Sequence, residues 1–213
     1  MEEVSRRIRL VVFDLDGTLT TVDSLWRYLH EAFGTWERGR AAAQRYRNGE
    51  ISYKEWAETD ARFWAGVPLA QVKNIIGRIP YREGAEEVFS DLKVRGVKIV
   101  ILSAGLSLLA EKAATDLGAD LAIANELRTN DGRLTGGIDV KVAVNNKEEV
   151  VRQVALTLNI PLREVALVGD RGFDLASEEC LKIAFVPKDE TARREADYII
   201  EDGDLRAILQ YLR

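Results

Sequence analysis

The chain has 213 residues, of which 46% are hydrophobic, so it is long and apolar enough for one domain or for one domain with an inserted module. Its formal net charge of −5 argues against nucleic acid as the main partner, because binding to a phosphate backbone needs a basic surface. Its longest apolar runs have only the length of strands, which indicates neither a signal peptide nor a membrane span, and we expect a cytoplasmic protein that acts on a small molecule.

The first predicted element is an apolar strand that ends in two aspartates and a glycine, within the stretch LVVFDLDGTLT of residues 10–20. Side chains two residues apart in a strand point the same way, so Asp14 and Asp16 converge at its carboxyl end, where open α/β sheets bind their ligands. One carboxylate can attack phosphorus to form an aspartyl-phosphate, and the other can protonate the leaving alcohol and then activate water. Because two anions repel a phosphate, such a site needs Mg²⁺ and a lysine. The pattern therefore predicts phosphoryl transfer, and an ordinary aspartate-rich turn is the alternative.

Residues 19–79 show helical spacing only, and we interpret them as an inserted helical-bundle module. All four tryptophans of the chain fall inside it, so we expect it to build a small core of its own. Packing explains these aromatic side chains better than a stacking site for substrate does. His30 lies on a patterned helix, and we expect a structural role for it. The predicted helices span residues 23–33, 35–48, 52–64 and 68–79.

From residue 80 onward strand and helix patterns alternate, as a parallel sheet with crossover helices requires. Asn130, Asp131 and Gly132 predict a hairpin turn between two of the later strands. The sequence therefore predicts an α/β fold with a Rossmann-like parallel sheet, in which residues 1–18 and 80–213 form the core. The later predicted strands are residues 97–102, 121–124, 126–128, 134–140, 165–168, 183–185 and 198–200, and the later predicted helices are residues 85–95, 106–117, 147–158 and 205–212.

Polar residues stand at the ends of the later strand patterns and at the start of one helical pattern. Ser103 follows the second strand and can cap the next helix, whereas Lys147 begins a helical pattern and can be a solvated surface lysine. Lys141 is a rival to Lys147, although it lies within an alternating strand pattern. Asp170 and Asp174 stand in GDRGFD after a further strand and can be turn and first-turn helix residues. Together these signals are less easily explained by turns and caps than each is alone.

The chain resembles the haloacid dehalogenase (HAD) superfamily of phosphatases, which has four sequence motifs. The matching features occur in the family's order: the stretch DLDGTLT, Ser103 after its strand, Lys147 in NNKEEVV and the stretch GDRGFD. The resemblance implies that Asp14 is the nucleophile and that Asp16 is the general acid and then the general base. It also implies that residues 19–79 form a cap that closes on the substrate, with hinges near residues 18–22 and 78–84. The implied phosphate ligands are Ser103 and Lys147, and the implied Mg²⁺ ligands are Asp14, Asp16, Asp170 and Asp174.

Over nearly its whole length the chain is similar to the phosphoserine phosphatase-like subfamily, through YREGAEEVFSDLKVRGVKIVILSAG and ANELRTNDGRLTG. Asp23 aligns with the glutamate that pairs with the serine ammonium in that subfamily, so we expect Asp23 to face the substrate. Asp60 aligns with an arginine that grips the serine carboxylate, and we expect Asp60 to repel a carboxylate. Arg171 and Phe173 replace a small residue and an amide of the fourth motif. These departures weigh against serine specificity.

The sequence thus predicts a Mg²⁺-dependent phosphomonoesterase that hydrolyses a small phosphorylated metabolite through an aspartyl-phosphate. One alternative is a phosphotransferase or mutase of the same fold that acts on a sugar or amino-alcohol phosphate, since Asp16 permits either reaction. Another is a non-catalytic binding module, whose signature would be a missing nucleophile, acid, lysine or metal aspartate, and none is missing. The physiological substrate and the oligomeric state stay open.

Overall fold

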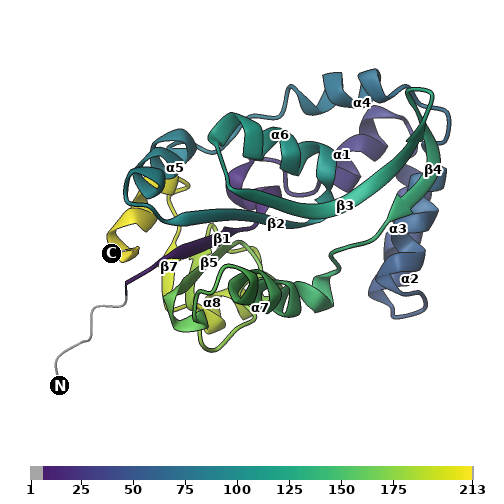
Figure 1. Cartoon of the computed structure of the whole chain (residues 1–213). Helices are drawn as coiled ribbons and strands as arrows, with labels where there is room; N and C mark the ends of the chain where they lie inside the picture. Colours follow the sequence, from purple (N-terminus) through teal and green to yellow (C-terminus); the bar gives the residue numbers. More distant parts are fainter. Residues whose placement is uncertain (1–6, 213) are drawn as a thin grey trace.

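The computed structural model describes residues 7–212, and its centre is a seven-stranded sheet (Figure 1). The strand order is β4-β3-β2-β1-β5-β6-β7, and all neighbours pair in parallel except β3 and β4, which pair antiparallel. This confirms the predicted α/β class with a parallel sheet. The predicted core begins at residue 1 and ends at residue 213, and residues 1–6 and 213 lie outside the described part. The strands are β1 Leu10–Phe13, β2 Lys98–Leu106, β3 Leu121–Asn130, β4 Arg133–Asp139, β5 Val165–Gly169, β6 Leu181–Phe185 and β7 Tyr198–Ile200.

Strand β1 lies at the middle of the sheet, where the strand order reverses. Its four apolar residues are buried on both faces, as parallel strands covered by helices require. Val12 pairs with Val100 of β2 on one side and with Leu167 of β5 on the other. Ligands of open α/β sheets bind in the crevice outside the strand ends at such a reversal. The topology therefore brings the ends of β1, β2 and β5 to one place.

Helices cover both faces of the sheet, with α5 and α6 on one side and α7 and α8 on the other (Figure 1). Two apolar clusters correspond to these two layers: one includes Phe89 of α5, which stacks on Phe13 with ring centroids 5.0 Å apart, and the other includes Val151 of α7. The sheet is thus a central layer whose two faces are both buried. The helices are α5 Ala85–Val94, α6 Ser107–Leu117, α7 Lys147–Thr157 and α8 Glu190–Glu195.

Four helices lie between β1 and α5, as the helical spacing predicts. Two have side-chain caps: the Ser24 hydroxyl accepts a hydrogen bond from the Arg27 amide, and Ser52 forms a capping box with Glu55. The segments that enter and leave this helical region lie side by side, because the Thr21 amide donates to the Pro80 carbonyl at 3.4 Å. The helices are α1 Leu25–Ala32, α2 Trp36–Arg47, α3 Tyr53–Arg62 and α4 Leu69–Ile76.

The expectation that these four helices build a core of their own is wrong. Their buried side chains, among them Trp26 and Trp64, belong to one continuous apolar cluster with α5, α6 and one face of the sheet. The reason is the β3–β4 hairpin, which extends beyond the sheet and reaches the helices (Figure 1). The Gly66 amide before α4 donates to the Leu134 carbonyl of β4 at 2.8 Å. The hairpin therefore joins the helical region to the sheet.

Two further elements differ from the sequence prediction. The patterns of residues 121–124 and 126–128 form one strand, β3, which continues through Asn125. The last helix, Leu205–Tyr211, is a 3₁₀-helix, because it forms bonds between residues three apart such as that from the Ala207 amide to the Asp204 carbonyl at 3.2 Å. Within residues 7–212, no helix is both long and apolar enough to span a membrane.

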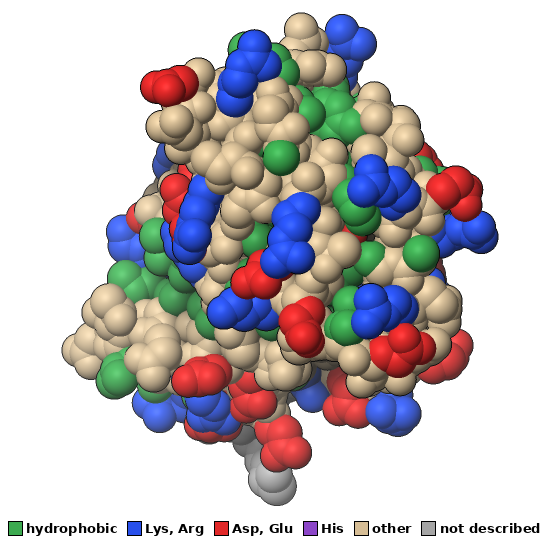
Figure 2. Space-filling view, turned by 90° about the vertical axis from the view of Figure 1, so that its right-hand side faces the viewer, with side chains coloured by type: hydrophobic (Ala, Val, Ile, Leu, Met, Phe, Trp, Pro, Cys, Tyr) green, Lys and Arg blue, Asp and Glu red, His purple; other side chains and the backbone are tan. Residues whose placement is uncertain are grey.

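The surface formed by α2, α3 and β4 carries basic and acidic side chains next to one another (Figure 2). On α3, Arg62 and Glu58 pair at 3.7 Å, and across the hairpin Arg128 pairs with Asp139. Exposed pairs of this kind contribute about 0–1 kcal/mol each. The apolar contacts beneath this surface, and not its ion pairs, therefore hold the helices in place.

A buried histidine–aspartate pair lies inside the helical region. The Nε2 atom of His30 lies 3.1 Å from Oδ2 of Asp60, and both side chains are about 1–2% exposed. The other ring nitrogen of His30 lies 2.7 Å from the Thr35 hydroxyl, and a Cβ atom at Gly39 would approach the ring to 2.6 Å. Burial raises the pKa of Asp60, and His30 offsets part of that effect. This confirms a structural role for His30.

We expect the substitution Asp60→Ala to lower the free energy of unfolding by about 3 kcal/mol, because it leaves the buried His30 without its partner. Urea unfolding measures the change. The matched control is Glu58→Ala, two residues away on the same helix and in exposed pairs only, which should change the free energy by less than about 0.5 kcal/mol. Equal effects of the two substitutions would contradict this prediction.

Candidate active site

The Asp14 carboxylate lies directly after β1 and is held at both oxygens. Its Oδ1 accepts a hydrogen bond from Nζ of Lys147 at 2.7 Å, and its Oδ2 accepts one from the Thr18 hydroxyl at 3.1 Å. The Asp14 amide donates to the Val168 carbonyl of β5 at 2.9 Å, which fixes the backbone at the end of the sheet. The side chain is 8% exposed. The group that the sequence predicts as nucleophile is thus fixed in position and reachable.

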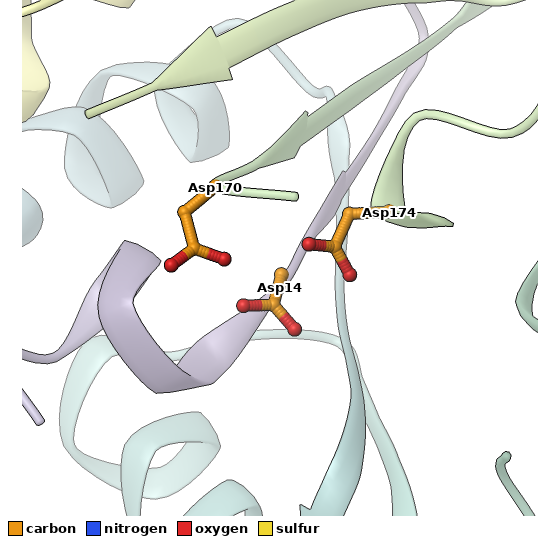
Figure 3. Close-up of side chains that lie close together, drawn as sticks. All are labelled: Asp14, Asp170 and Asp174. Atoms are coloured by element: carbon orange, nitrogen blue, oxygen red, sulfur yellow. The ribbon is translucent and has the colours of Figure 1, made fainter. Parts of the chain in front are cut away.

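Three carboxylates come together at the ends of β1 and β5 (Figure 3). One oxygen of each of Asp14, Asp170 and Asp174 lies within 4.8 Å of the others. Both oxygens of Asp174 accept hydrogen bonds, from Lys147 and from the Arg171 amide, whereas Oδ2 of Asp170 is buried and has no hydrogen-bond partner among residues 7–212. Burial and the Asp14 charge raise the pKa of Asp170 to about 8 and that of Asp174 to about 7. A buried set of carboxylate oxygens with one orphaned atom fits a hard divalent cation such as Mg²⁺.

Lys147 is the cation of this cluster. It is the first residue of α7 and is 3% exposed, and its ammonium bridges Asp14 and Asp174. Burial by itself would lower the pKa of Lys147, but the two carboxylates outweigh burial and raise it. The rival Lys141 instead pairs with Glu126 at 2.9 Å and is half exposed. Of the two lysines, Lys147 is the one that the fold brings to the site.

Asp16 lies in the turn that follows Asp14. Its Oδ2 accepts a hydrogen bond from the Leu25 amide at 2.8 Å, whereas its Oδ1 is buried without a partner among the described residues. Burial raises the pKa of Asp16 to about 7, and the Asp14 charge adds to the effect. Gly17 has φ of 85°, and a Cβ atom there would lie 2.4 Å from Oδ2 of Asp170, so only glycine fits. A carboxyl group with a pKa near neutrality is suited to general acid and base chemistry.

Ser103 lies in β2 on the other side of β1 and is 1% exposed. Its hydroxyl oxygen accepts a hydrogen bond from the Gly105 amide at 2.8 Å, which leaves its proton free to donate to a ligand. A Cβ atom at Gly105 would lie 3.0 Å from that oxygen and 3.1 Å from Oδ2 of Asp16. Ser103 and Asp16 are therefore close neighbours in the crevice.

A cavity of about 300 Å³ connects these groups. All the site residues predicted from the sequence line it: Asp14, Asp16, Asp23, Ser103, Lys147, Asp170 and Asp174. Its other walls come from the helical region and from the loop after β5. The side chains of these walls include Trp26, Tyr46, Arg47, Tyr53, Trp56, Arg171 and Phe173. Two of the tryptophans that the sequence assigns to packing, Trp26 and Trp56, thus also border the cavity.

Two acidic residues that the sequence places near substrate behave differently from one another. Asp23 lines the cavity, and its carboxylate lies 3.2 Å from Nζ of Lys188, which follows β6. Asp60 does not line the cavity, because its side chain points into the helical region against His30. The expectation that Asp60 repels a substrate carboxylate is therefore wrong. An alignment gives a residue's place on the helix, but the burial of His30 decides which way Asp60 faces.

The carbonyl of Ala104, next to Ser103, accepts several hydrogen bonds that the sequence did not predict. It accepts hydrogen bonds from the Tyr53 hydroxyl of α3, from Nδ2 of Asn125 at 2.9 Å and from Nε1 of Trp26 at 3.4 Å. The Asn125 side chain is fully buried, and its Oδ1 accepts hydrogen bonds from the amides of residues 141 and 142. The available signal was a lone amide between the apolar patterns of residues 121–124 and 126–128.

Comparisons with known proteins identify the family of this chain. The family model of haloacid dehalogenase-like hydrolases matches residues 11–177. A phosphoserine phosphatase of Methanocaldococcus jannaschii is 32% identical to this chain, over 99% of this chain and 100% of the relative. A phosphoserine phosphatase of Archaeoglobus fulgidus is 32% identical over 98% of this chain, which spans 61% of that longer protein. The solved structure of a phospho-aspartyl intermediate analogue of phosphoserine phosphatase has a TM-score of 0.81 and 31% identity, and covers 97% of this chain and 100% of that chain.

We expect the metal-free protein to lose stability as the pH rises from about 4 to about 8. Asp16, Asp170 and Asp174 have ordinary pKa values of 3.8 that folding raises to about 7 or 8, so the folded state holds more protons than the unfolded state across this window. Surface acids with lowered pKa values, such as Asp116, change the stability at pH values below this window. With a chelator present, Tm should be lower at about pH 8 than at about pH 5, and added Mg²⁺ should raise Tm more at the higher pH.

The control for this measurement is Asp170→Asn, which removes one of the three groups. It should flatten the dependence of Tm on pH and reduce the gain from Mg²⁺. A wild-type Tm that rises through the window, or a variant with the same slope and the same gain, would show that these carboxyls do not set the pH dependence.

Proposed function

This chain belongs to the haloacid dehalogenase-like hydrolase family and is a phosphoric monoester hydrolase, and from that premise we propose that it cleaves a small phosphate ester at the Asp14 cavity with Mg²⁺ as cofactor. The observation that carries the proposal is the buried set of Asp14, Lys147, Asp174 and Asp170 at the ends of β1 and β5. Such a set supplies the nucleophile and the Lys147 ammonium at one point, together with carboxylates that can hold Mg²⁺ against the charge of the substrate.

In the first step, a carboxylate oxygen of Asp14 attacks phosphorus and the bond between phosphorus and the leaving alcohol breaks. Asp16 gives its proton to that alcohol, for which a pKa of about 7 is suited. The Lys147 ammonium and the Ser103 hydroxyl bind the phosphoryl oxygens and offset their charge. Asp14, Asp170, Asp174 and the Asp16 carbonyl would hold Mg²⁺, which would supply further positive charge against the developing anion.

In the second step, the Asp16 carboxylate takes a proton from a water molecule, and that water attacks phosphorus. The bond between phosphorus and the Asp14 carboxylate breaks, and phosphate leaves. Asp16 is then protonated again and ready for the next ester. One residue therefore serves as acid and base in turn, as the sequence predicts.

Residues 19–79 act as a cap over this site, and residues 1–18 with 80–213 act as the core that carries the chemistry. The support is that α1, α2 and α3 contribute side chains to the cavity. The paired segments near residues 18–22 and 78–84 are the hinges. Closure of such a cap excludes bulk water and strengthens the charge interactions at phosphorus.

The substrate is small, because a cavity of about 300 Å³ lies at the lower end of ligand sites. Phosphoserine is the first ester to test, since the relatives above are phosphoserine phosphatases. Transfer of the phosphoryl group to a second alcohol uses the same residues, and the products separate it from hydrolysis: free phosphate forms in hydrolysis, and a new ester forms in transfer.

We expect Asp14→Asn to lower phosphate release by roughly 10³-fold or more, because an amide cannot serve as this nucleophile. Release is measured with Mg²⁺ and with a chelator across a panel of phosphate monoesters that includes phosphoserine and 4-nitrophenyl phosphate. Wild-type release should require the metal. A variant that keeps full phosphate release would exclude Asp14 as the nucleophile. The Tm of the variant is measured to check that it is folded.

We expect the cost of Asp16→Asn to depend on the leaving group. For alkyl phosphates the loss should be about 10²–10⁴-fold, because the departing alkoxide needs a proton. For 4-nitrophenyl phosphate the first step should lose far less, because nitrophenolate leaves without one. Single-turnover release of the alcohol measures that step alone. Equal losses for both esters would remove Asp16 from the role of general acid.

A further inference from the structure

Two arginines line the cavity, Arg47 and Arg171, and the charge of Arg171 offsets part of the rise in the pKa of its neighbour Asp170. Arg47 is the last residue of α2, and its Nη2 donates to Oε1 of Gln44 at 2.9 Å. Arg171 follows Asp170 in the loop after β5 and is half-buried. Both border the cavity that holds Asp14, and within residues 7–212 neither guanidinium forms an ion pair. Arg45, two residues before Arg47, lies outside the cavity and pairs with Glu50 at 3.4 Å.

The two acidic side chains of the helical region that the sequence places near substrate both have a basic partner. Asp23 pairs with Lys188, and Asp60 pairs with His30 away from the cavity. The Asp23–Lys188 pair is exposed and therefore weak, but a substrate ammonium at Asp23 would lie beside the Lys188 ammonium, and like charges repel. Among the cavity residues that the helical region supplies, Asp23 and Arg47 are the charged ones, and Arg47 forms no ion pair with any residue from 7 to 212.

Aromatic residues lie close in sequence to both arginines and line the same cavity. Tyr46, which precedes Arg47, stacks on Trp56 with ring centroids 5.3 Å apart and planes 8° apart, and both line the cavity. Phe173 lies in the same loop as Arg171 and also lines the cavity. A guanidinium binds a carboxylate through two parallel hydrogen bonds. The exposed Arg47 and the half-buried Arg171 can therefore offer such bonds at a cavity with aromatic walls.

We propose that Arg47 and Arg171 are specificity residues that bind a second acidic group of the substrate, and that the substrate is a phosphate monoester of a hydroxy acid without an ammonium group. This inference rests on the proposed function, because it concerns the alcohol part of the ester that the Asp14 site cleaves. The phosphoryl end is recognised by Lys147 and Ser103, so the two arginines decide between alcohols.

The test uses four primary alkyl phosphates that differ in two charged groups and have similar leaving groups. O-phosphoserine carries a carboxylate and an ammonium, and 3-phosphonooxypropanoate carries the carboxylate alone. O-phosphoethanolamine carries the ammonium alone, and ethyl phosphate carries neither. For the wild-type enzyme, the carboxylate should raise kcat/KM by about 10- to 100-fold from ethyl phosphate to 3-phosphonooxypropanoate. The ammonium should give no gain in either pair.

The substitutions Arg47→Met and Arg171→Met should each reduce the carboxylate ratio, defined as kcat/KM for 3-phosphonooxypropanoate divided by that for ethyl phosphate. Arg45→Met, on the same helix but outside the cavity, should keep the wild-type ratio. A ratio corrects for general loss of active enzyme, and Tm is measured for each variant. A fall in one arginine variant alone would overturn the assignment of the other arginine.

The inference is overturned if the wild-type enzyme prefers phosphoserine to 3-phosphonooxypropanoate, or if neither arginine variant reduces the carboxylate ratio. Failure to cleave any of the four esters, with 4-nitrophenyl phosphate still cleaved, would overturn the substrate class and leave the proposed phosphatase intact. Failure to release phosphate from any ester, 4-nitrophenyl phosphate included, would overturn the proposed function and this inference with it.

Discussion

The concentration of negative charge at the end of β1 is the constraint on which the rest of the site depends. Asp14, Asp170 and Asp174 lie within 4.8 Å of one another in a buried place, where like charges repel strongly. The ammonium of Lys147 offsets part of this charge from inside the cluster, whereas burial and the Asp14 charge raise the pKa values of Asp170 and Asp174. Three carboxylates around one ammonium leave the site short of positive charge, which supports the proposed Mg²⁺.

The same turn ties the chemistry to the helical region. Asp16 is bonded to the first amide of α1, and the Ala104 carbonyl beside Ser103 receives side chains from α1 and α3. Asn125 joins that carbonyl to the backbone of residues 141–142, a few residues before Lys147. Displacement of the helices would therefore act, through direct hydrogen bonds, on Asp16 and on the backbone beside Ser103.

The sequence predicted the parallel sheet and the residues at its strand ends because both follow from local patterns. Asp14, Asp16 and Asp170 stand next to buried strands, so their place in the crevice follows from topology. Local patterns do not distinguish Lys147 from Lys141 as the lysine of the site, since both are charged residues near the start of one helix. The order of the four family motifs favoured Lys147. Arg47 and Tyr53 could not be found in this way, because the approach of α2 and α3 to the crevice depends on packing between distant segments.

For Asp60 the sequence predicted the correct position along α3 but the wrong direction of the side chain. Its neighbours on α3 do not reveal that His30 of α1 receives its carboxylate, and only the three-dimensional contact does.

The shared apolar cluster between the helical region and the sheet limits how such an enzyme diverges. Since α1–α4, α6 and the β3–β4 hairpin bury side chains in common, the helical region is not an exchangeable module. Grafting the corresponding segment of a relative would leave mismatched surfaces on α6 and on the hairpin, with cavities or clashes in the joint core. Changes of specificity are therefore most accessible through single substitutions on the cavity wall, where a side chain such as Arg47 is exposed and free of core packing.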